Sequence, residues 1–343
     1  MTIPDAIAQL ADFGNLTCVE ASELMSQLMK GEGTPAQIAA LLIALRMKGE
    51  TVDEITGFAE TMRAMATPVV TRRRPLVDTC GTGGDHSGTF NISTTAAFVV
   101  AGAGVAVAKH GNRNASSKCG SADVLEALGV NLDASPELMG QCIDQLGIGF
   151  LFARTLHGAM KHVAPVRGEL KTRTVFNLLG PLTNPAGADG QVLGVYDYRR
   201  IKPMAQVLLN LGTRRAYVVA GADGLDEFTL CGPTLVAEAR NGAIHEYEIT
   251  PEEVGLPGAA HEELAGGAAD ENARILRAVL LAEKGPKRDI VLFNAAAALL
   301  AGDAATDWKE AVAQAAESID SGAATKKLDN LIALTNGRAT RPE

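Results

Sequence analysis

Apolar residues recur at three- and four-residue steps through residues 1–70, with polar residues between them. This spacing predicts amphipathic helices and no strands. Thr17 is placed to cap one helix with Glu20 three positions later, and Gly31 is placed to end it. The next two helices repeat this design, beginning after Thr34 and Thr51. The first seventy residues are therefore expected to form a small helical bundle.

After Pro75 the pattern changes to short apolar runs that alternate with helical segments, which is typical of βαβ units and a mainly parallel sheet. We expect strands at 76–78, 105–109, 148–152, 190–197 and 215–224, and helices at 93–103, 121–128, 136–146, 201–211, 270–283, 287–300 and 307–334. Residues 234–250 read as a hairpin with Asn241-Gly242 at its turn.

The predicted fold class is α/β, with a small all-helical N-terminal domain and a large α/β domain built on a mainly parallel central sheet. The segment 170–190 is helical and then rich in turn residues, so it could pack back on the bundle. The expected division is 1–70, completed by about 170–190, against 75–169 with 191–343.

The chain of 343 residues is 47% hydrophobic, with a net charge of −9 and a pI of about 5.3. This charge argues against a general nucleic-acid binder, which needs Lys and Arg to neutralise phosphates. Five scattered cysteines without a C-x-x-C pair argue against a disulfide framework or a zinc site. We see no signal peptide and no apolar run long enough to span a bilayer, so we expect a soluble protein of the cytoplasm.

Residues 78–95, "DTCGTGGDHSGTFNISTT", form a loop rich in glycine and hydroxyls between a predicted strand and a predicted helix. Backbone N–H groups at the start of a helix favour an anion, and glycines allow close approach to a phosphate. The loop contains no Lys or Arg, and it matches neither the P-loop nor the Rossmann pattern. Alone, "GTGG" could be only a tight βα turn.

The missing cations appear in the stretch "KHGNRNASSKCGSAD", which begins at Lys109 and follows another predicted strand. Lys109, His110, Arg113 and Lys118 lie among asparagines and serines there. Because ligands of α/β sheets bind at the carboxyl ends of the strands, the two loops predict a phosphate site with one dipolar and one cationic lobe. Taken singly, Arg113 or Lys118 could be a solvated surface residue.

Two further groups carry possible chemistry. Asp226-Glu227 follows a predicted strand and could bind Mg²⁺, with Asp85 and Ser93 as further oxygen ligands, although such a pair is also common on solvated surfaces. Arg167 could clamp a carboxylate or form an ion pair between domains, and its spacing does not decide.

His157 and His162 lie five residues apart, off the spacing of a helical metal pair, and are expected to be packing or surface residues. No G-x-S-x-G motif and no specific Cys-His pair is present.

The motifs "CGTGGD", "TFNIST", "KHGNR", "SSKCGSAD", "KHVAPVR", "NLLGPLTNP" and "GLDE" occur in this order, and with them the sequence resembles the anthranilate phosphoribosyltransferases of tryptophan biosynthesis. The resemblance covers nearly the whole chain. It implies a homodimer of the nucleoside-phosphorylase-like class, one or two Mg²⁺ per subunit, and an active site between the two domains. The implied reaction moves the 5-phosphoribosyl group from phosphoribosyl diphosphate to the amine of anthranilate.

The resemblance also implies roles for individual residues. Those for phosphoribosyl diphosphate are Gly81, Gly84, Asp85, Thr89, Asn91, Ile92, Ser93, Thr94, Lys109, His110, Gly111, Asn112, Arg113, Asn114, Ala115, Ser116, Ser117 and Ser121. Those for anthranilate are Gly81, His110, Asn112, Arg167, Gly180 and Pro181, and those for the metal are Ser93, Asp226 and Glu227. The sequence departs from the family pattern at Asn114, Cys119, Gly158 and Gly168.

An aromatic amine is already a nucleophile, so this reaction needs no Ser, Cys or His nucleophile and no catalytic acid or base. It needs charge stabilisation on the leaving diphosphate and positioning of the amine. Two alternatives remain: a pyrimidine-nucleoside phosphorylase of the same fold class, and a non-catalytic relative that binds nucleic acid.

Overall fold

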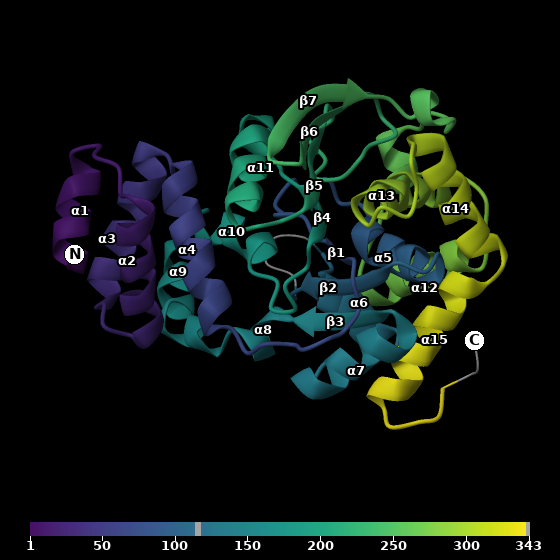
Figure 1. Cartoon of the computed structure of the whole chain (residues 1–343), viewed down its shortest axis with the longest axis horizontal. Coiled ribbons are helices and arrows are strands. Elements are labelled where there is room, and N and C mark those ends of the chain that lie inside the picture. Colours follow the sequence, from purple (N-terminus) through teal and green to yellow (C-terminus); the bar gives the residue numbers. More distant parts are fainter. Residues whose placement is uncertain (114–117, 341–343) are drawn as a thin grey trace.

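The computed structural model describes residues 1–113 and 118–340, and it has two parts that Figure 1 shows side by side. The N-terminal helices are α1 (Ile3–Ala11), α2 (Cys18–Lys30), α3 (Pro35–Lys48) and α4 (Val52–Met65). The predicted caps are confirmed: Thr17 and Glu20 form a reciprocal capping box, Thr34 and Thr51 cap α3 and α4, and Gly31 ends α2 in the left-handed conformation.

Within the described residues, the second part is built on a seven-stranded sheet in the order β3-β2-β1-β4-β5-β6-β7. The strands are β1 (Leu76–Thr79), β2 (Ala106–Gly111), β3 (Ile148–Phe152), β4 (Gly190–Gly194), β5 (Arg215–Gly221), β6 (Thr234–Arg240) and β7 (Ala243–Ile249). Strands β3 to β5 in this order are parallel, and β6 and β7 are antiparallel. The predicted fold class is therefore confirmed, as is the β6–β7 hairpin, whose turn has positive φ at Asn241 and Gly242.

Helices cover both faces of this sheet (Figure 1). The helices that follow β1 in the chain are α5 (Ile92–Gly102), α6 (Ser121–Ala127), α7 (Pro136–Leu146), α8 (Ala153–Leu156), α9 (Ala164–Leu170), α10 (Phe176–Leu179), α11 (Ile201–Asn210), α12 (Ala269–Leu280), α13 (Pro286–Ala301), α14 (Trp308–Asp320) and α15 (Ala323–Thr335). Of these, α9 and α10 contact the bundle helices α3 and α4. Short 3₁₀ turns lie at Gly158–His162, Gly180–Leu182, Tyr198–Arg200, Glu252–Val254 and His261–Leu264.

One sequence prediction is wrong. The helix expected at 307–334 is two helices, α14 and α15, because Gly322 takes a left-handed conformation (φ +77°) between them. The apolar spacing continues on both sides of this break, so periodicity alone did not reveal it.

Successive residues of the central strands enter two different cores. In β5, Tyr217 and Val219 belong to the core beneath α5 and α13, whereas Ala216 and Val218 belong to a second core. This second core continues through α11 into the helical bundle and also includes residues from 163–182. The bundle and one face of the sheet therefore share buried apolar surface.

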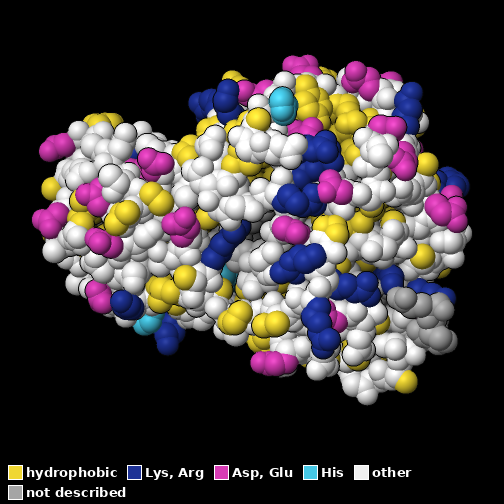
Figure 2. Space-filling view, in the orientation of Figure 1, with side chains coloured by type: hydrophobic (Ala, Val, Ile, Leu, Met, Phe, Trp, Pro, Cys, Tyr) yellow, Lys and Arg dark blue, Asp and Glu magenta, His cyan; other side chains and the backbone are white. Residues whose placement is uncertain are grey.

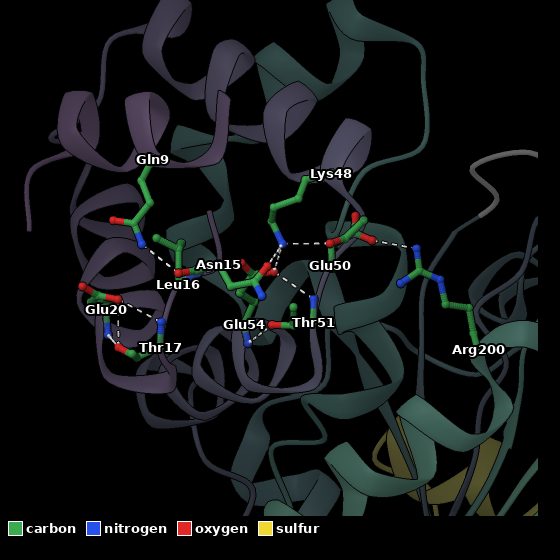
Figure 3. Close-up of polar contacts among 11 residues, drawn as sticks. Gln9, Asn15, Leu16, Thr17, Glu20, Lys48, Glu50, Thr51, Glu54 and Arg200 are labelled. Atoms are coloured by element: carbon green, nitrogen blue, oxygen red, sulfur yellow. Dashed lines mark hydrogen bonds and ion pairs between the residues drawn. The ribbon is translucent and has the colours of Figure 1, made fainter. Parts of the chain in front are cut away.

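Polar contacts reinforce this junction. Arg63 of α4 donates hydrogen bonds to the carbonyls of Leu182 and Leu211, at 2.6 and 3.2 Å. Arg200 pairs with Glu50 at 2.7 Å across the boundary, as Figure 3 shows. No helix in residues 1–113 or 118–340 is both long enough and apolar enough to cross a membrane.

Candidate active site

The glycine-rich loop after β1 lies against the loop after β5. The amides of Cys80 and Thr82 continue the pairing with β4, donating to the carbonyls of Val192 and Gly194 at 3.1 and 2.9 Å. The chain then turns through Gly83 and Gly84, whose φ angles of +67° and +79° suit glycine. This turn points the Gly83 amide at the loop after β5.

The Asp226-Glu227 pair closes this site from the opposite side. Asp226 Oδ2 accepts a hydrogen bond from the Gly83 amide at 2.7 Å. The approach is close: a Cβ on Gly81 would lie 2.3 Å from Asp226 Oδ2, and one on Gly194 would lie 1.5 Å from the Asp226 carbonyl oxygen. Sequence reasoning did not single out Gly194, although a glycine inside the predicted strand 190–197 is a signal for close backbone approach.

One residue of the predicted cationic lobe, Lys109, reaches the same pair. Lys109 is buried, its ammonium donates to the Thr79 carbonyl, and it lies 3.4 Å from Ser93 Oγ. The Ser93 amide, at the start of α5, donates to Glu227 Oε1 at 3.2 Å. The glycine-rich loop and Lys109 therefore converge on adjacent carboxylates, as the two-lobed prediction requires.

The positive charge and hydrogen-bond donors around Asp226 and Glu227 do not fully compensate the negative charge of the two carboxylates. Burial, followed by repulsion from Asp85 and Glu227, raises the pKa of Asp226 well above its usual range. Burial raises the pKa of Glu227 to about 7, although Lys109 and the Ser93 hydrogen bonds oppose the shift. Converging buried carboxylates with raised pKa values are the environment in which a hard divalent cation is favoured.

A second buried network, centred on Asp78, lies next to Lys109 and His110. Asp78 is fully buried, and it accepts hydrogen bonds from the His110 amide at 3.1 Å and from Asn184 Nδ2 at 2.9 Å. Burial raises the pKa of Asp78 to about 6, although Lys109 opposes the shift. Sequence reasoning did not identify Asp78, because nothing in a short apolar strand reveals its distant partners.

His110 forms a buried pair with His157, which the sequence assigned to packing or the surface. Burial lowers the pKa of His110 to about 3 and that of His157 to about 4, so both rings are neutral at pH 7. His110 Nδ1 lies 3.1 Å from the Gly180 carbonyl, which can only accept, so Nδ1 carries the hydrogen. His110 Nε2 lies 3.2 Å from His157 Nε2, and the His157 ring has the Thr183 backbone as a second partner.

Other predicted phosphate residues have their side chains engaged elsewhere. Arg113 is half-exposed and pairs with Asp123 at 3.0 Å and Glu126 at 2.7 Å. The Asn91 side chain donates to the Cys119 carbonyl at 3.2 Å and accepts from Asn272 at 2.9 Å. Some of these partners are distant in the sequence, and all are of common residue types, so no local sequence pattern predicts these hydrogen bonds and ion pairs.

The remaining predicted residues line the same strand ends or fall outside the described residues. Ile92 and Thr94 are buried in the first turns of α5, and Thr89 Oγ1 lies 3.2 Å from Ser87 Oγ. A Cβ on Gly111 would lie 2.2 Å from Ser121 Oγ, so the end of β2 touches the start of α6. The Asn112 carbonyl accepts from the Ala122 amide at 3.1 Å. Asn114, Ala115, Ser116 and Ser117 lie outside the described residues.

Arg167 lies in α9, where its guanidinium stands over the ring of Phe176 at 5.2 Å. Burial lowers its pKa, and it has no ion pair among the described residues. The following segment leads through α10 to Gly180 and Pro181; the Pro181 carbonyl accepts from Gln191 at 2.6 Å. An unpaired, partly buried guanidinium is suited to an incoming carboxylate.

Sequence reasoning missed Arg173. Its guanidinium donates to the Gly84 carbonyl and stacks 3.7 Å above the ring of Tyr196. A basic "KTRT" run was the available signal. Of the departures from the family pattern, Gly158 and Gly168 have no atom within 4 Å of an added Cβ, so larger residues fit at both positions.

Lys and Arg side chains gather along the middle of the face shown in Figure 2, mostly over the α/β part. Acidic side chains are scattered over the bundle on the same face. The molecule is therefore acidic overall but offers local cations on this face of the α/β part.

Comparisons with known proteins identify the family. Residues 4–66 match the helical bundle domain of a glycosyl transferase family, and residues 73–325 match its α/β domain. The anthranilate phosphoribosyltransferase of Symbiobacterium thermophilum is 58% identical over 96% of this chain and 97% of its own length.

Solved structures agree with these matches. The anthranilate phosphoribosyltransferase of Thermus thermophilus has a TM-score of 0.92 at 51% identity, covering 97% of this chain and 99% of that one. The enzyme of Saccharomyces cerevisiae, in complex with PRPP and Mg, has a TM-score of 0.90 at 27% identity over 98% of each chain. A further structure of the S. cerevisiae enzyme contains 4-fluoroanthranilate, with a TM-score of 0.88 at 26% identity over 98% of each chain.

The helical bundle, the mainly parallel sheet and the converging strand-end loops thus define an enzyme of this glycosyl transferase family. Within the family, the chain belongs to the anthranilate phosphoribosyltransferases. The two alternatives drawn from the sequence, a nucleoside phosphorylase and a nucleic-acid binder, are not favoured by these matches.

Proposed function

We propose that this protein transfers the 5-phosphoribosyl group from phosphoribosyl diphosphate to the amine of anthranilate. The products are N-(5-phosphoribosyl)anthranilate and diphosphate, and the reaction is assisted by Mg²⁺. The observation that carries this proposal is 58% identity over nearly the full length to an anthranilate phosphoribosyltransferase. The role in tryptophan biosynthesis follows from the same resemblance.

The residues present fit a magnesium site. Asp226 and Glu227, with Asp85 nearby, supply hard oxygen ligands whose mutual repulsion a divalent cation relieves. Ser93 Oγ, 3.4 Å from Lys109 Nζ, is a further oxygen beside Glu227. When bound, Mg²⁺ supplies charge neutralisation to the leaving diphosphate.

The diphosphate is proposed to bind between the glycine-rich loop and Lys109. The amides of Gly83 and Ser93 donate to the carboxylates of Asp226 and Glu227, at 2.7 and 3.2 Å. Engagement of these carboxylates by a cation would release both amides toward an anionic ligand. The N-terminus of α5 then favours negative charge beside Ser93.

Anthranilate is proposed to bind from the bundle side of this loop. Arg167, which has no carboxylate partner among the described residues, is suited to its carboxylate. Neutral His110 and the Gly180-Pro181 turn would line the approach without adding charge. An uncharged approach avoids repulsion of an oxocarbenium-like centre at the sugar.

The chain's own residues act by electrostatics and positioning. The amine attacks the anomeric carbon with inversion while the bond to diphosphate breaks, and Lys109 stabilises the charge that the leaving group gains. Neither an acid-base pair nor a covalent intermediate is required, which agrees with the neutral, buried His110–His157 pair.

Three organisational proposals accompany this function. The helical domain comprises residues 1–70 and is completed by about 170–190, supported by the buried cluster that joins Val175 and Phe176 to the bundle. A homodimer is proposed from the resemblance alone. Residence in the cytoplasm is proposed from the scattered cysteines.

Anthranilate consumption, followed by its fluorescence, tests the function. We expect loss of the signal only when phosphoribosyl diphosphate and Mg²⁺ are both present. Persistence of the signal with both would contradict the proposal. Release of free base from thymidine or uridine with phosphate would favour a phosphorylase instead, and submicromolar DNA binding at low salt would favour a nucleic-acid binder.

A further inference from the structure

Three side chains with metal-ligating atoms meet beside the candidate active site, outside the set assigned to Mg²⁺. Within the described residues, one ligand atom each of Asp223, Cys231 and His261 lies within 4.8 Å of the other two. Asp223 and Cys231 flank the Asp226-Glu227 pair in the loop between β5 and β6. His261 begins the 3₁₀ turn before α12.

The orientation of His261 leaves a lone pair facing this cluster. Its Nε2 lies 2.8 Å from the carbonyl oxygen of Ser87, which can only accept, so Nε2 carries the hydrogen. In the neutral ring Nδ1 is then unprotonated, and it lies 3.8 Å from Asp223 Oδ2. Metal-binding histidines have this arrangement, with one ring N–H donated to a backbone carbonyl and the other nitrogen free for the metal.

The other two donors are fixed by one hydrogen-bonded turn. Asp223 Oδ2 accepts from Thr229 Oγ1 at 2.9 Å, and this hydroxyl oxygen accepts from the Cys231 amide at 3.0 Å. Asp223 Oδ1 accepts from the Leu225 amide at 3.3 Å. The turn therefore holds a carboxylate and a thiol on the side of the loop that faces His261.

We propose that Asp223, Cys231 and His261 bind one Zn²⁺, or a similarly thiophilic divalent cation, at a site separate from that of Mg²⁺. Sulfur, imidazole nitrogen and carboxylate oxygen are the ligand types of zinc, and three protein ligands leave a fourth position for water. A tetrahedral zinc ion separates such atoms by about 3.4–3.6 Å, so small side-chain rotations complete the shell. The Nδ1 to Oδ2 distance of 3.8 Å is already close to this value.

The site would join two loops of the candidate active site. His261 contacts the glycine-rich loop through Ser87, and Asp223 and Cys231 belong to the loop of Asp226 and Glu227. A bound cation would therefore stiffen the frame around the phosphate site without contacting the substrates.

The different ligand preferences of the two sites allow a selective experiment. Mg²⁺ prefers oxygen ligands in an octahedral shell, whereas a thiolate selects softer ions. Full-length protein is stripped with a chelator and titrated with Co²⁺ in excess Mg²⁺, and the near-ultraviolet charge-transfer band of a cobalt thiolate is recorded. Zn²⁺ is then added as a competitor. We expect one Co²⁺ per chain and displacement by one equivalent of Zn²⁺.

Single substitutions test the contributions of Cys231 and His261 to Co²⁺ binding. Cys231→Ser should abolish the band. His261→Gln, which keeps the thiol, should weaken Co²⁺ binding by at least about tenfold, the lower end of the cost of losing even an outer-shell partner. Cys18→Ser is the matched control: Cys18 is also a partly buried thiol near a carboxylate, 3.7 Å from Glu60, and its loss should change nothing. Circular dichroism establishes that each variant is folded.

A band that persists in Cys231→Ser, an unchanged affinity in His261→Gln, or no stoichiometric binding would overturn the proposal. Anthranilate turnover with Mg²⁺ alone is measured in parallel. Co²⁺ binding by a protein inactive toward anthranilate would contradict the proposed function and leave this site standing, so the two failures are distinguishable.

Discussion

The buried Lys48–Glu54 pair in the helical bundle yields a quantitative prediction. Glu54 is fully buried, and its Oε2 accepts from Lys48 Nζ at 3.0 Å and from the Thr51 amide at 2.8 Å. Its Oε1 accepts from the Leu16 amide at 2.9 Å. The carboxylate thus ties the loop between α1 and α2 to the loop between α3 and α4, as Figure 3 shows.

Glu54→Gln preserves the shape of the side chain but replaces one acceptor oxygen with a donor. In either orientation of the amide, at least one buried donor faces another donor, and Lys48 loses its countercharge. Breaking a buried pair in this way costs about 3–5 kcal/mol. The double variant Lys48→Met with Glu54→Gln should recover part of this loss, because no charge is then left unpaired.

Hydrogen exchange of amides in residues 15–60 measures this local stability directly. At about 1.4 kcal/mol per tenfold change, Glu54→Gln should accelerate exchange of the protected amides by roughly 140- to 4,000-fold. The matched control is the exposed pair of Lys202 and Glu246, 2.6 Å apart with side chains 65% and 53% exposed. Glu246→Gln should cost less than about 1 kcal/mol. An acceleration below about tenfold for Glu54→Gln would refute the reasoning.

Three further predictions concern the active site. Arg167→Ala should raise the KM for anthranilate by roughly 10- to 150-fold, which corresponds to the loss of one charge-assisted hydrogen bond. The KM for phosphoribosyl diphosphate should stay nearly unchanged, and a rise in that KM would contradict the assignment of Arg167 to anthranilate. Folding raises the pKa of Glu227 to about 7 from 4.5, so its contribution to stability is present at low pH and is lost as the pH rises through about 7. Stabilisation by Mg²⁺ in thermal unfolding should therefore grow between pH 6 and pH 8 and disappear in the Asp226→Asn, Glu227→Gln variant; persistence there would exclude these ligands. Gly194→Ala, whose Cβ would lie 1.5 Å from the Asp226 carbonyl, should lower kcat by at least about tenfold while exchange in the bundle stays unchanged.

Local signals predicted the helical part well. Thr17 and Glu20 determine a helix start through hydrogen bonds three residues apart, and Gly31 ends the helix through its own backbone freedom. The same holds for the β6–β7 turn at Asn241-Gly242. Such features depend only on neighbours in the sequence. The break at Gly322 was missed because the apolar spacing continues across it.

The site shows where sequence reasoning reaches its limit. The convergence of Lys109 with the glycine-rich loop is expected from the rule for strand ends in parallel sheets, and Lys109 Nζ lies 3.4 Å from Ser93 Oγ at the start of α5. The sequence could not predict that Asn91 bonds to Cys119 and Asn272, or that Arg113 pairs with Asp123 and Glu126. Asn and Arg side chains also bind phosphate, so their residue types do not show which partner they have. The pairing of His110 with His157 depends on a buried contact between residues 47 apart.

The second hydrophobic core has a practical consequence for fragments of this protein. It runs without interruption from the helices of the bundle through α11 to one face of the sheet. Cutting the chain after α4 would leave apolar side chains such as Phe58 and Met62 without the α10 and α11 surfaces that cover this side of the bundle. Such a truncation would associate through its uncovered face, so engineering of the bundle is best done in the intact chain.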